Sequence, residues 1–164
     1  MRKKITVGLL FGGKSSEHEV SLQSAASILA AIDQTKYNIV LIGITKEGQW
    51  RSDPNFSLGQ LSKILDEGTP VFLTNNYEGS GHLIPFNPSS DRIGQKIKID
   101  VFFPVLHGPF GEDGKIQGLF EMASVPYVGA GVLSSAIAMD KCMTKTFFQQ
   151  AGLPTVPFIS IYLE

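Results

Sequence analysis

The sequence predicts an α/β fold in which a parallel sheet carries helices on both faces. Runs rich in Ile, Val and Leu alternate along the chain with segments whose apolar residues recur at helical spacing. This alternation is typical of parallel strands, which must be joined by crossover connections such as helices. Hydrophobic residues make up 43% of the 164 positions and charged residues 18%. Such a chain can bury a core, so we expect one domain, or one domain and the beginning of another.

The first strand is expected from Lys4 to Phe11 and is followed by a helix. Ser16 and Glu19 have capping-box spacing, so this helix should begin near Glu17. Its apolar positions share one face: Leu22, Ala25, Ala26, Leu29 and Ile32. Glu17 falls in the first turn, where exposed N–H groups stabilise a carboxylate. It is either an ordinary N-terminal helix charge or a fixed anion in a cleft, suited to hold an ammonium group.

The elements after the first helix continue the alternation. We expect strands at 37–45, 99–106 and 126–128, and helices at 116–124, 132–139 and 140–151. The stretch 46–95 is rich in proline and glycine, so it is an elaboration of the fold or a flexible surface insertion rather than a separate core. The final run, 158–163, is strand-like. Because a strand needs partners, we expect that the chain is truncated there or borrows a partner from elsewhere.

The most informative segment is the loop at 107–114, which reads His-Gly-Pro-Phe-Gly-Glu-Asp-Gly. It follows the apolar run 101–106, and ligands of open α/β sheets bind at this carboxyl edge. Its three glycines let the backbone turn sharply and approach a ligand closely. The loop is either a turn whose His107 and Asp113 cap the next helix, or a site that gathers a histidine and two carboxylates.

Two glycine-rich turns approach nucleotide-binding patterns. Residues 8–15 fit the P-loop spacing G-x-x-x-x-G-K-[ST], so a phosphotransferase using Lys14 and Ser15 is one alternative function. Residues 9–11 argue against it, because they continue the apolar strand where a P-loop needs exposed backbone. Residues 129–134 approach a dinucleotide fingerprint, but no strand-end acid follows about twenty residues on. We expect a tight strand-to-helix turn there.

Composition excludes several classes of protein. The net charge is −1 without a basic stripe, so we expect no nucleic-acid partner. Cys142 is the only cysteine, which excludes a disulfide framework and fits a reducing compartment. No apolar run is long enough to span a membrane, and the basic and apolar N-terminus lacks the cleavage site of a signal peptide. We therefore expect a cytoplasmic protein with no membrane partner.

The chain resembles the N-terminal part of the D-alanine–D-alanine ligases. Residues 107–118 match that family's signature H-G-x-x-G-E-D-G-x-φ-Q-G without a departure. Further matches follow the family's order at 11–21, 125–129 and 139–141. The resemblance extends over the full chain, although 46–95 aligns loosely.

The resemblance implies how the chain divides into domains. Residues 1–130 would form a preATP-grasp domain, a Rossmann-like α/β unit built on a parallel sheet, with 46–95 as an elaborated insertion. Residues 131–164 would form a helical connector and the start of a truncated ATP-grasp domain.

The resemblance also implies an activity. These ligases join two D-alanine molecules with ATP and magnesium through an acyl phosphate, for peptidoglycan synthesis. Glu17 matches the residue that contacts the ammonium group of the first D-alanine, and Val20 matches a side chain on its methyl group. His107 matches a histidine near the acyl phosphate. Glu17 and His107 are thus the expected catalytic residues, and all three side chains are expected to bind substrate.

Other matched residues would support this site. Glu112 and Asp113 are expected behind it, where Glu112 would hold the loop and His107. Lys141 matches a lysine that reaches the ATP phosphates. The magnesium-binding acids and the main adenine pocket match nothing in this chain, so we assign no metal site. We therefore expect the chain alone to bind substrates weakly and to turn over nothing, and the complete enzyme to be a homodimer.

Two alternatives remain besides the phosphotransferase. A non-catalytic module could bind an amino acid or a nucleotide with the same α/β fold. A D-alanine–D-lactate ligase is a variant within the family, and the pocket that separates it from the D-alanine enzyme is mostly absent from this chain.

Overall fold

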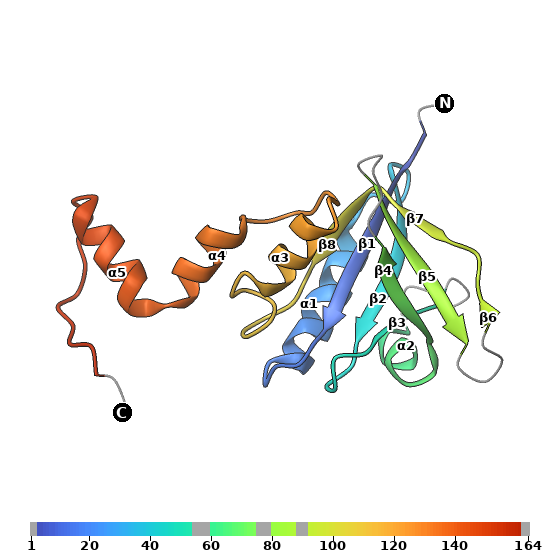
Figure 1. Ribbon diagram of the computed structural model, residues 1–164, viewed down its shortest axis with the longest axis horizontal. Helices are drawn as coiled ribbons and strands as arrows, with labels where there is room; N and C mark the ends of the chain where they lie inside the picture. The colour runs from blue at the N-terminus through green and yellow to red at the C-terminus, as the bar shows by residue number, and fades with distance from the viewer. Residues whose placement is uncertain (1–2, 54–59, 75–79, 88–91, 162–164) are drawn as a thin grey trace.

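The computed structural model describes residues 3–53, 60–74, 80–87 and 92–161. The strands are β1 (Ile5–Gly12), β2 (Tyr37–Ile44), β3 (Trp50–Ser52), β4 (Thr69–Thr74), β5 (Gly81–Asn87), β6 (Arg92–Ile93), β7 (Ile97–Ile99) and β8 (Val101–Pro104). The helices are α1 (His18–Ala31), α2 (Leu61–Glu67), α3 (Lys115–Met122), α4 (Val132–Met139) and α5 (Lys141–Gln150). The strands join in the order β6-β5-β4-β3-β2-β1-β8, and β7 pairs with β5 (Figure 1).

β1 is the centre of a parallel part of the sheet. It pairs in parallel with β2 along its whole length and with β8 from Val7 to Leu10. α1 forms the crossover from β1 to β2. The predicted parallel sheet is confirmed for these three strands. Because parallel strands end at the same edge, the segments that follow β1 and β8 leave the sheet close together.

The rest of the sheet is antiparallel, so the expectation of a parallel sheet is wrong for this part. β3 pairs with β2 and β4, and β5 pairs with β4, β6 and β7, all antiparallel. Antiparallel neighbours need no crossover helix, and among the described residues of this part α2, between β3 and β4, is the one helix that interrupts the strands. The described residues of 46–95 therefore extend the main sheet and are no flexible surface insertion. Val71 and Leu83 from this stretch are buried in the core.

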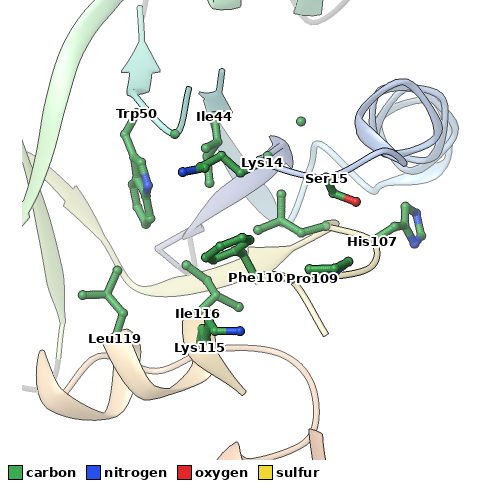
Figure 2. A pocket seen from close by; sticks show the side chains of 15 residues that line it. Lys14, Ser15, Ile44, Trp50, His107, Pro109, Phe110, Lys115, Ile116 and Leu119 are labelled. Carbon is green, nitrogen blue, oxygen red and sulfur yellow. The ribbon is translucent and has the colours of Figure 1, made fainter. Parts of the chain in front are cut away.

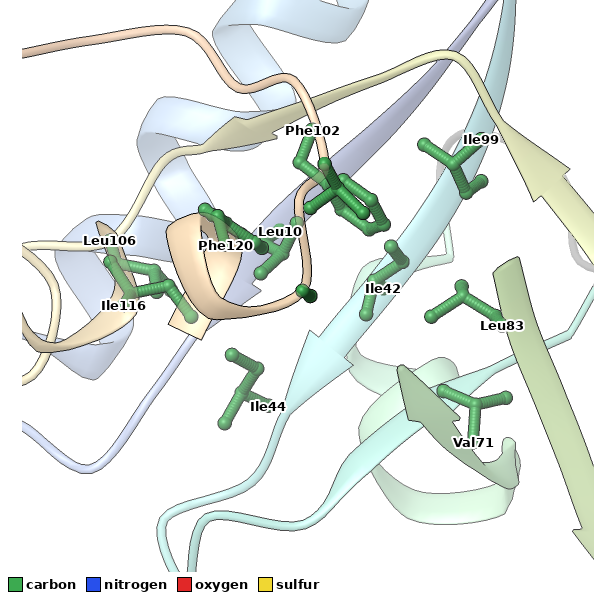
Figure 3. Close-up of a cluster of buried hydrophobic side chains, with 12 residues drawn as sticks. Leu10, Ile42, Ile44, Val71, Leu83, Ile99, Phe102, Leu106, Ile116 and Phe120 are labelled. Carbon is green, nitrogen blue, oxygen red and sulfur yellow. The ribbon is translucent and has the colours of Figure 1, made fainter. Parts of the chain in front are cut away.

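The core lies on both faces of the sheet, because alternate residues of a strand point to opposite sides. Leu9 and Phe11 pack against the face covered by α1 and α2. Leu10 packs on the other face with Phe102 and with Phe120 of α3 (Figure 3). The rings of Phe102 and Phe120 stack with their centroids 5.0 Å apart. The expected helices on both faces are thus confirmed.

The start of α1 differs in detail from the prediction. The capping box of Ser16 and Glu19 does not form, since Glu17 occupies the N-cap position and no side chain caps the helix there. Glu17 enters the helix from a turn, with φ −95° and ψ 20°, instead of the extended conformation usual for a capping residue. The hydroxyl of Ser15 accepts the N–H of Glu17 at 3.1 Å. The buried residues of α1 are His18, Ser21, Ala25 and Leu29.

The two C-terminal helices are confirmed, but the strand expected after them is not. Asp140 caps α5, since its carboxylate accepts two backbone N–H groups at 2.9 Å. Gly152 ends it with a φ of +71°. Residues 158–161, the described part of the expected strand, form no strand, because no neighbouring strand pairs with them. α5 has no buried residue and extends with α4 away from the sheet (Figure 1).

No helix within the described ranges is both long enough and apolar enough to cross a membrane.

The stacked pair predicts a stability change. Phe120→Ala removes a fully buried ring and should lower the free energy of unfolding by about 3–5 kcal/mol, through lost burial and the cavity left behind. Met122→Ala, on the same helix but 83% exposed, is the control and should leave it nearly unchanged. Urea unfolding at 25 °C followed by circular dichroism measures both. Equal effects of the two substitutions would contradict the packing.

Candidate functional site

Two loops meet at the carboxyl edge of the parallel strands. One, at 13–17, follows β1, and the other, at 105–114, follows β8. The fully buried hydroxyl of Ser21 on α1 joins the end of β1 to the beginning of the second loop. It accepts the N–H of Gly12 at 2.8 Å and donates to the carbonyl of Val105. Side chains from distant parts of the sequence are therefore held together at this edge.

Glu17 lies immediately before α1, and its carboxylate rests against Gly108 of the second loop. A Cβ atom on Gly108 would stand 2.5 Å from Glu17 Oε2 and 2.9 Å from Ser15 Oγ. Gly108 also has a φ of +68°, a conformation in which other residues are strained. The missing side chain lets the carboxylate of one loop close onto the backbone of the other. Glu17 remains exposed to solvent, so the carboxylate is open to a ligand.

His107 is half-buried beside α1. Its Nε2 atom lies 3.0 Å from the hydroxyl of Ser24, 83 residues earlier in the chain. Figure 2 shows the imidazole on the α1 side of the loop, whereas Phe110 lies on the opposite side. The two side chains therefore leave the loop in different directions, and both residues line the same pocket.

Glu112 and Asp113 hold the loop through its backbone. The carboxylate of Glu112 accepts the N–H of Gly108 at 2.7 Å, next to His107. Asp113 accepts the N–H of Phe110 at 3.0 Å and pairs with the ammonium group of Lys115. Burial by itself would raise the pKa of the Asp113 carboxyl, but the Lys115 ammonium and two backbone N–H groups outweigh it and lower the pKa below its ordinary value.

The other two predicted site residues lie in different places. Val20 is on α1, one helical turn after Glu17, and is 46% exposed. Lys141 is the exposed first residue of α5, on the part of the chain that extends away from the sheet (Figure 1). The structure thus gathers Glu17, Val20 and His107 around one edge and leaves Lys141 outside this group.

Sequence reasoning missed three residues that shape the site. Ser21 and Ser24 bond to the second loop, and Gln117, also buried, donates from its side-chain amide to the carbonyl of Gly111 at 3.0 Å. The sequence held a signal for Ser24, because it follows Val20 by four residues and therefore shares its helix face. What each hydroxyl reaches depends on the second loop, which no local pattern reveals.

A pocket of about 230 Å³ is lined by residues of both loops, with Ser15 and His107 among them. Figure 2 shows Trp50, Lys14, Phe110 and Leu119 around it. The ring of Phe110 lies under two cations, with the Lys14 Nζ 5.6 Å and the Lys115 Nζ 4.9 Å from its centroid. Phe110 also has a φ of +68°, uncommon for a residue with a side chain.

The two nucleotide-binding patterns are not realised as phosphate loops. Residues 9–11 are fully buried inside β1, so their N–H groups serve the sheet and the P-loop alternative is wrong. Residues 129–131 form the turn that leads into α4, as expected. Within the described residues, no group of three or more His, Cys, Asp or Glu side chains could hold a metal ion. The described His, Cys, Asp and Glu side chains therefore do not fit a magnesium site.

A comparison with protein families matches residues 6–130 to the family described as "D-ala D-ala ligase N-terminus". The chain belongs to this family. The match includes both loops of the candidate site and ends just before α4.

Curated ligases resemble the chain over almost its full length. The D-alanine–D-alanine ligase of Thermoanaerobacter pseudethanolicus is 49% identical over 98% of this chain, and D-alanine–D-alanine ligase B of Bradyrhizobium diazoefficiens is 47% identical over 97%. The chain spans only 44% and 42% of the lengths of these two relatives.

Solved ligase structures share the fold. The D-alanine–D-alanine ligase of Coxiella burnetii superimposes with a TM-score of 0.78 at 34% identity, covering 95% of this chain and 44% of that one. The VanG D-Ala:D-Ser ligase of Enterococcus faecalis superimposes with a TM-score of 0.76 at 37% identity, covering 92% and 43%. The α/β fold of this ligase domain is thereby confirmed, with a mixed sheet.

The contact of Glu17 with Gly108 predicts a stability change in this ligase domain. Gly108→Ala should lower the free energy of unfolding by about 1–3 kcal/mol, because the methyl group meets the carboxylate and φ is unfavourable. Gly118→Ala is the control, since Gly118 lies in α3 and a methyl group there would have nothing within 4 Å of it. It should raise stability by about 0.5–1 kcal/mol. Urea titration distinguishes them, and a harmless Gly108→Ala would refute the close contact.

The lowered pKa of Asp113 predicts a pH dependence. A carboxyl with a lower pKa in the folded state stabilises the fold above its unfolded pKa, and this contribution disappears as the pH falls through the folded value. The wild type should therefore exceed Asp113→Asn in stability at pH 7, and the difference should shrink below about pH 4. Lys115→Met should weaken the same pH dependence. Thermal unfolding between pH 2.5 and 7 measures it, and a constant difference would count against the pairing.

Proposed function

We propose that the chain is the N-terminal part of a cytoplasmic D-alanine–D-alanine ligase, an ATP-dependent carbon–nitrogen ligase of peptidoglycan synthesis. One observation carries this proposal. The carboxylate of Glu17 packs on Gly108, inside the loop that matches the ligase signature. A fixed anion and a half-buried histidine thus share one edge of the sheet.

The first D-alanine is bound through its ammonium group. The carboxylate of Glu17 is open to solvent yet supported by the second loop, so it can accept charge-assisted hydrogen bonds from an ammonium without reorganising. Val20, exposed one turn further along α1, is placed to contact the methyl group of the same substrate. An anion and an apolar contact on one helix face select a small amino acid.

The reaction then proceeds in two steps. The carboxylate of the first D-alanine takes the γ-phosphoryl group of ATP, which yields an acyl phosphate and ADP. The amine of the second D-alanine attacks the carbonyl carbon and loses a proton, and the tetrahedral intermediate expels phosphate. We assign His107 to the acyl phosphate, where an imidazole N–H stabilises the negative charge that develops on oxygen.

ATP and magnesium complete the proposed chemistry. Lys141 is the residue of this chain that we assign to the ATP phosphates, which need a positioned cation. Magnesium, when bound, neutralises phosphate charge, and no described residue of this chain is assigned to hold it. We propose a homodimer for the complete enzyme from the family resemblance.

D-Serine or D-lactate is a second candidate for the attacking substrate. The similarity to a D-Ala:D-Ser ligase at 37% identity favours keeping this alternative. Glu17, Val20 and His107 are proposed to act on the first D-alanine, so they do not distinguish between the possible second substrates. The complete gene product, assayed with ATP and D-alanine plus each second substrate in turn, decides between them, and no ligation with any of them would refute the proposal.

Glu17→Gln tests the substrate-binding role. In the complete gene product it should cost about 1.5–3 kcal/mol of transition-state binding, the range for a hydrogen bond to a charged group. This corresponds to a decrease of roughly 10- to 150-fold in kcat/KM for D-alanine.

Glu19→Gln is the matched control for this prediction. Glu19 lies in the first turn of α1, two residues after Glu17, but its carboxylate points to Lys46, 3.1 Å away. Its kcat/KM should stay near that of the wild type. Equal values for Glu17→Gln and the wild type would remove Glu17 from the site.

A further inference from the structure

We propose that Ser24 is a positioning residue that fixes the orientation of the His107 imidazole. The proposal rests on the proposed ligase function, since it concerns how His107 acts there. Ser24 lies on α1 and has no place in the four sequence matches that support the ligase resemblance.

The geometry ties α1 to the second loop at two points. Ser21 donates to the carbonyl of Val105, and Ser24, one helical turn later, bonds to Nε2 of His107 at 3.0 Å. Both Val105 and His107 belong to the short segment that leaves β8. One helix face thus sets the path of the backbone and, two residues later, the plane of the imidazole.

The bond also decides which ring nitrogen faces the site. Imidazole has two nitrogens, and a partner on one determines the role of the other. Because Nε2 is engaged by Ser24, Nδ1 is the nitrogen left for the substrate or the acyl phosphate. A ring flipped about its Cβ–Cγ bond would place the carbon Cε1 where Nε2 lies and would lose the bond to Ser24.

A hydroxyl can orient an imidazole ring in either of its protonation states. It can donate to an unprotonated Nε2 and can also accept from a protonated one, so the bond persists in either state. A carboxylate in the same place could only accept, so it would bond only to a ring whose Nε2 carries a proton. Ser24 therefore holds the orientation of His107 without fixing its charge, which suits a group facing charge that appears during the reaction.

Kinetics of the complete gene product test this role with three variants. Ser24→Ala should lower kcat about 5-fold, the effect of one neutral hydrogen bond, and leave the KM for ATP unchanged. Ser24→Thr keeps a hydroxyl and should restore most of kcat. Ser27→Ala is the matched control, because Ser27 is an exposed serine of α1 that bonds to the carbonyl of Gln23. A kcat for Ser24→Ala equal to that of Ser27→Ala would overturn the proposal.

Nitrogen NMR of the histidine rings provides an independent readout in the 164-residue chain. Ser24→Ala should change the ¹⁵N shifts of His107 and its balance of Nδ1–H and Nε2–H tautomers, whereas Ser27→Ala should not. Unchanged ring shifts in Ser24→Ala would overturn the contact itself. A wild-type enzyme that forms no dipeptide, combined with a ring that responds to Ser24→Ala, would instead refute the ligase function while the positioning of His107 stands.

Discussion

The site depends on the buried hydroxyl of Ser21, which bonds to the ends of two strands at once. It accepts from the backbone of Gly12, the last residue of β1, and donates to the backbone of Val105, the first residue after β8. Both residues are buried, and a buried backbone group left without a partner costs about 1–3 kcal/mol. α1 is thereby locked to both loops, and Glu17 and Ser24, on either side of Ser21, are held in fixed positions.

The second loop fits against α1 through a missing side chain at one position and a hydrogen bond to a carboxylate at another. Gly108 has no side chain where the carboxylate of Glu17 lies, and Glu112 accepts its N–H at 2.7 Å. Asp113 and Lys115 fix the following turn. Carboxylates of the loop itself thus accept its backbone N–H groups and pair with its lysine. These bonds fix the loop in place, which is consistent with the proposed binding of a small amino acid beside it.

The candidate site could be predicted from the sequence only where local signals exist. The loop at 107–114 and the start of α1 were recognisable because glycines, a histidine and carboxylates follow apolar strands. The contacts of Ser24 with His107 and of Gly108 with Glu17 were not, since they join positions 83 and 91 residues apart. The capping box predicted for Ser16 and Glu19 does not form because the chain enters α1 through a turn in which Glu17 takes the N-cap position.

The sequence by itself determined the strand–helix alternation, the parallel strands around β1 and the ends of α4 and α5, because apolar periodicity and capping residues act over a few positions. Only the tertiary structure decided that the described residues of 46–95 extend the sheet, and that residues 158–161 remain unpaired. Strand pairing is a contact between distant segments, so its presence depends on a partner strand rather than on local composition. The same holds for the site, whose residues converge only when β1 and β8 pair.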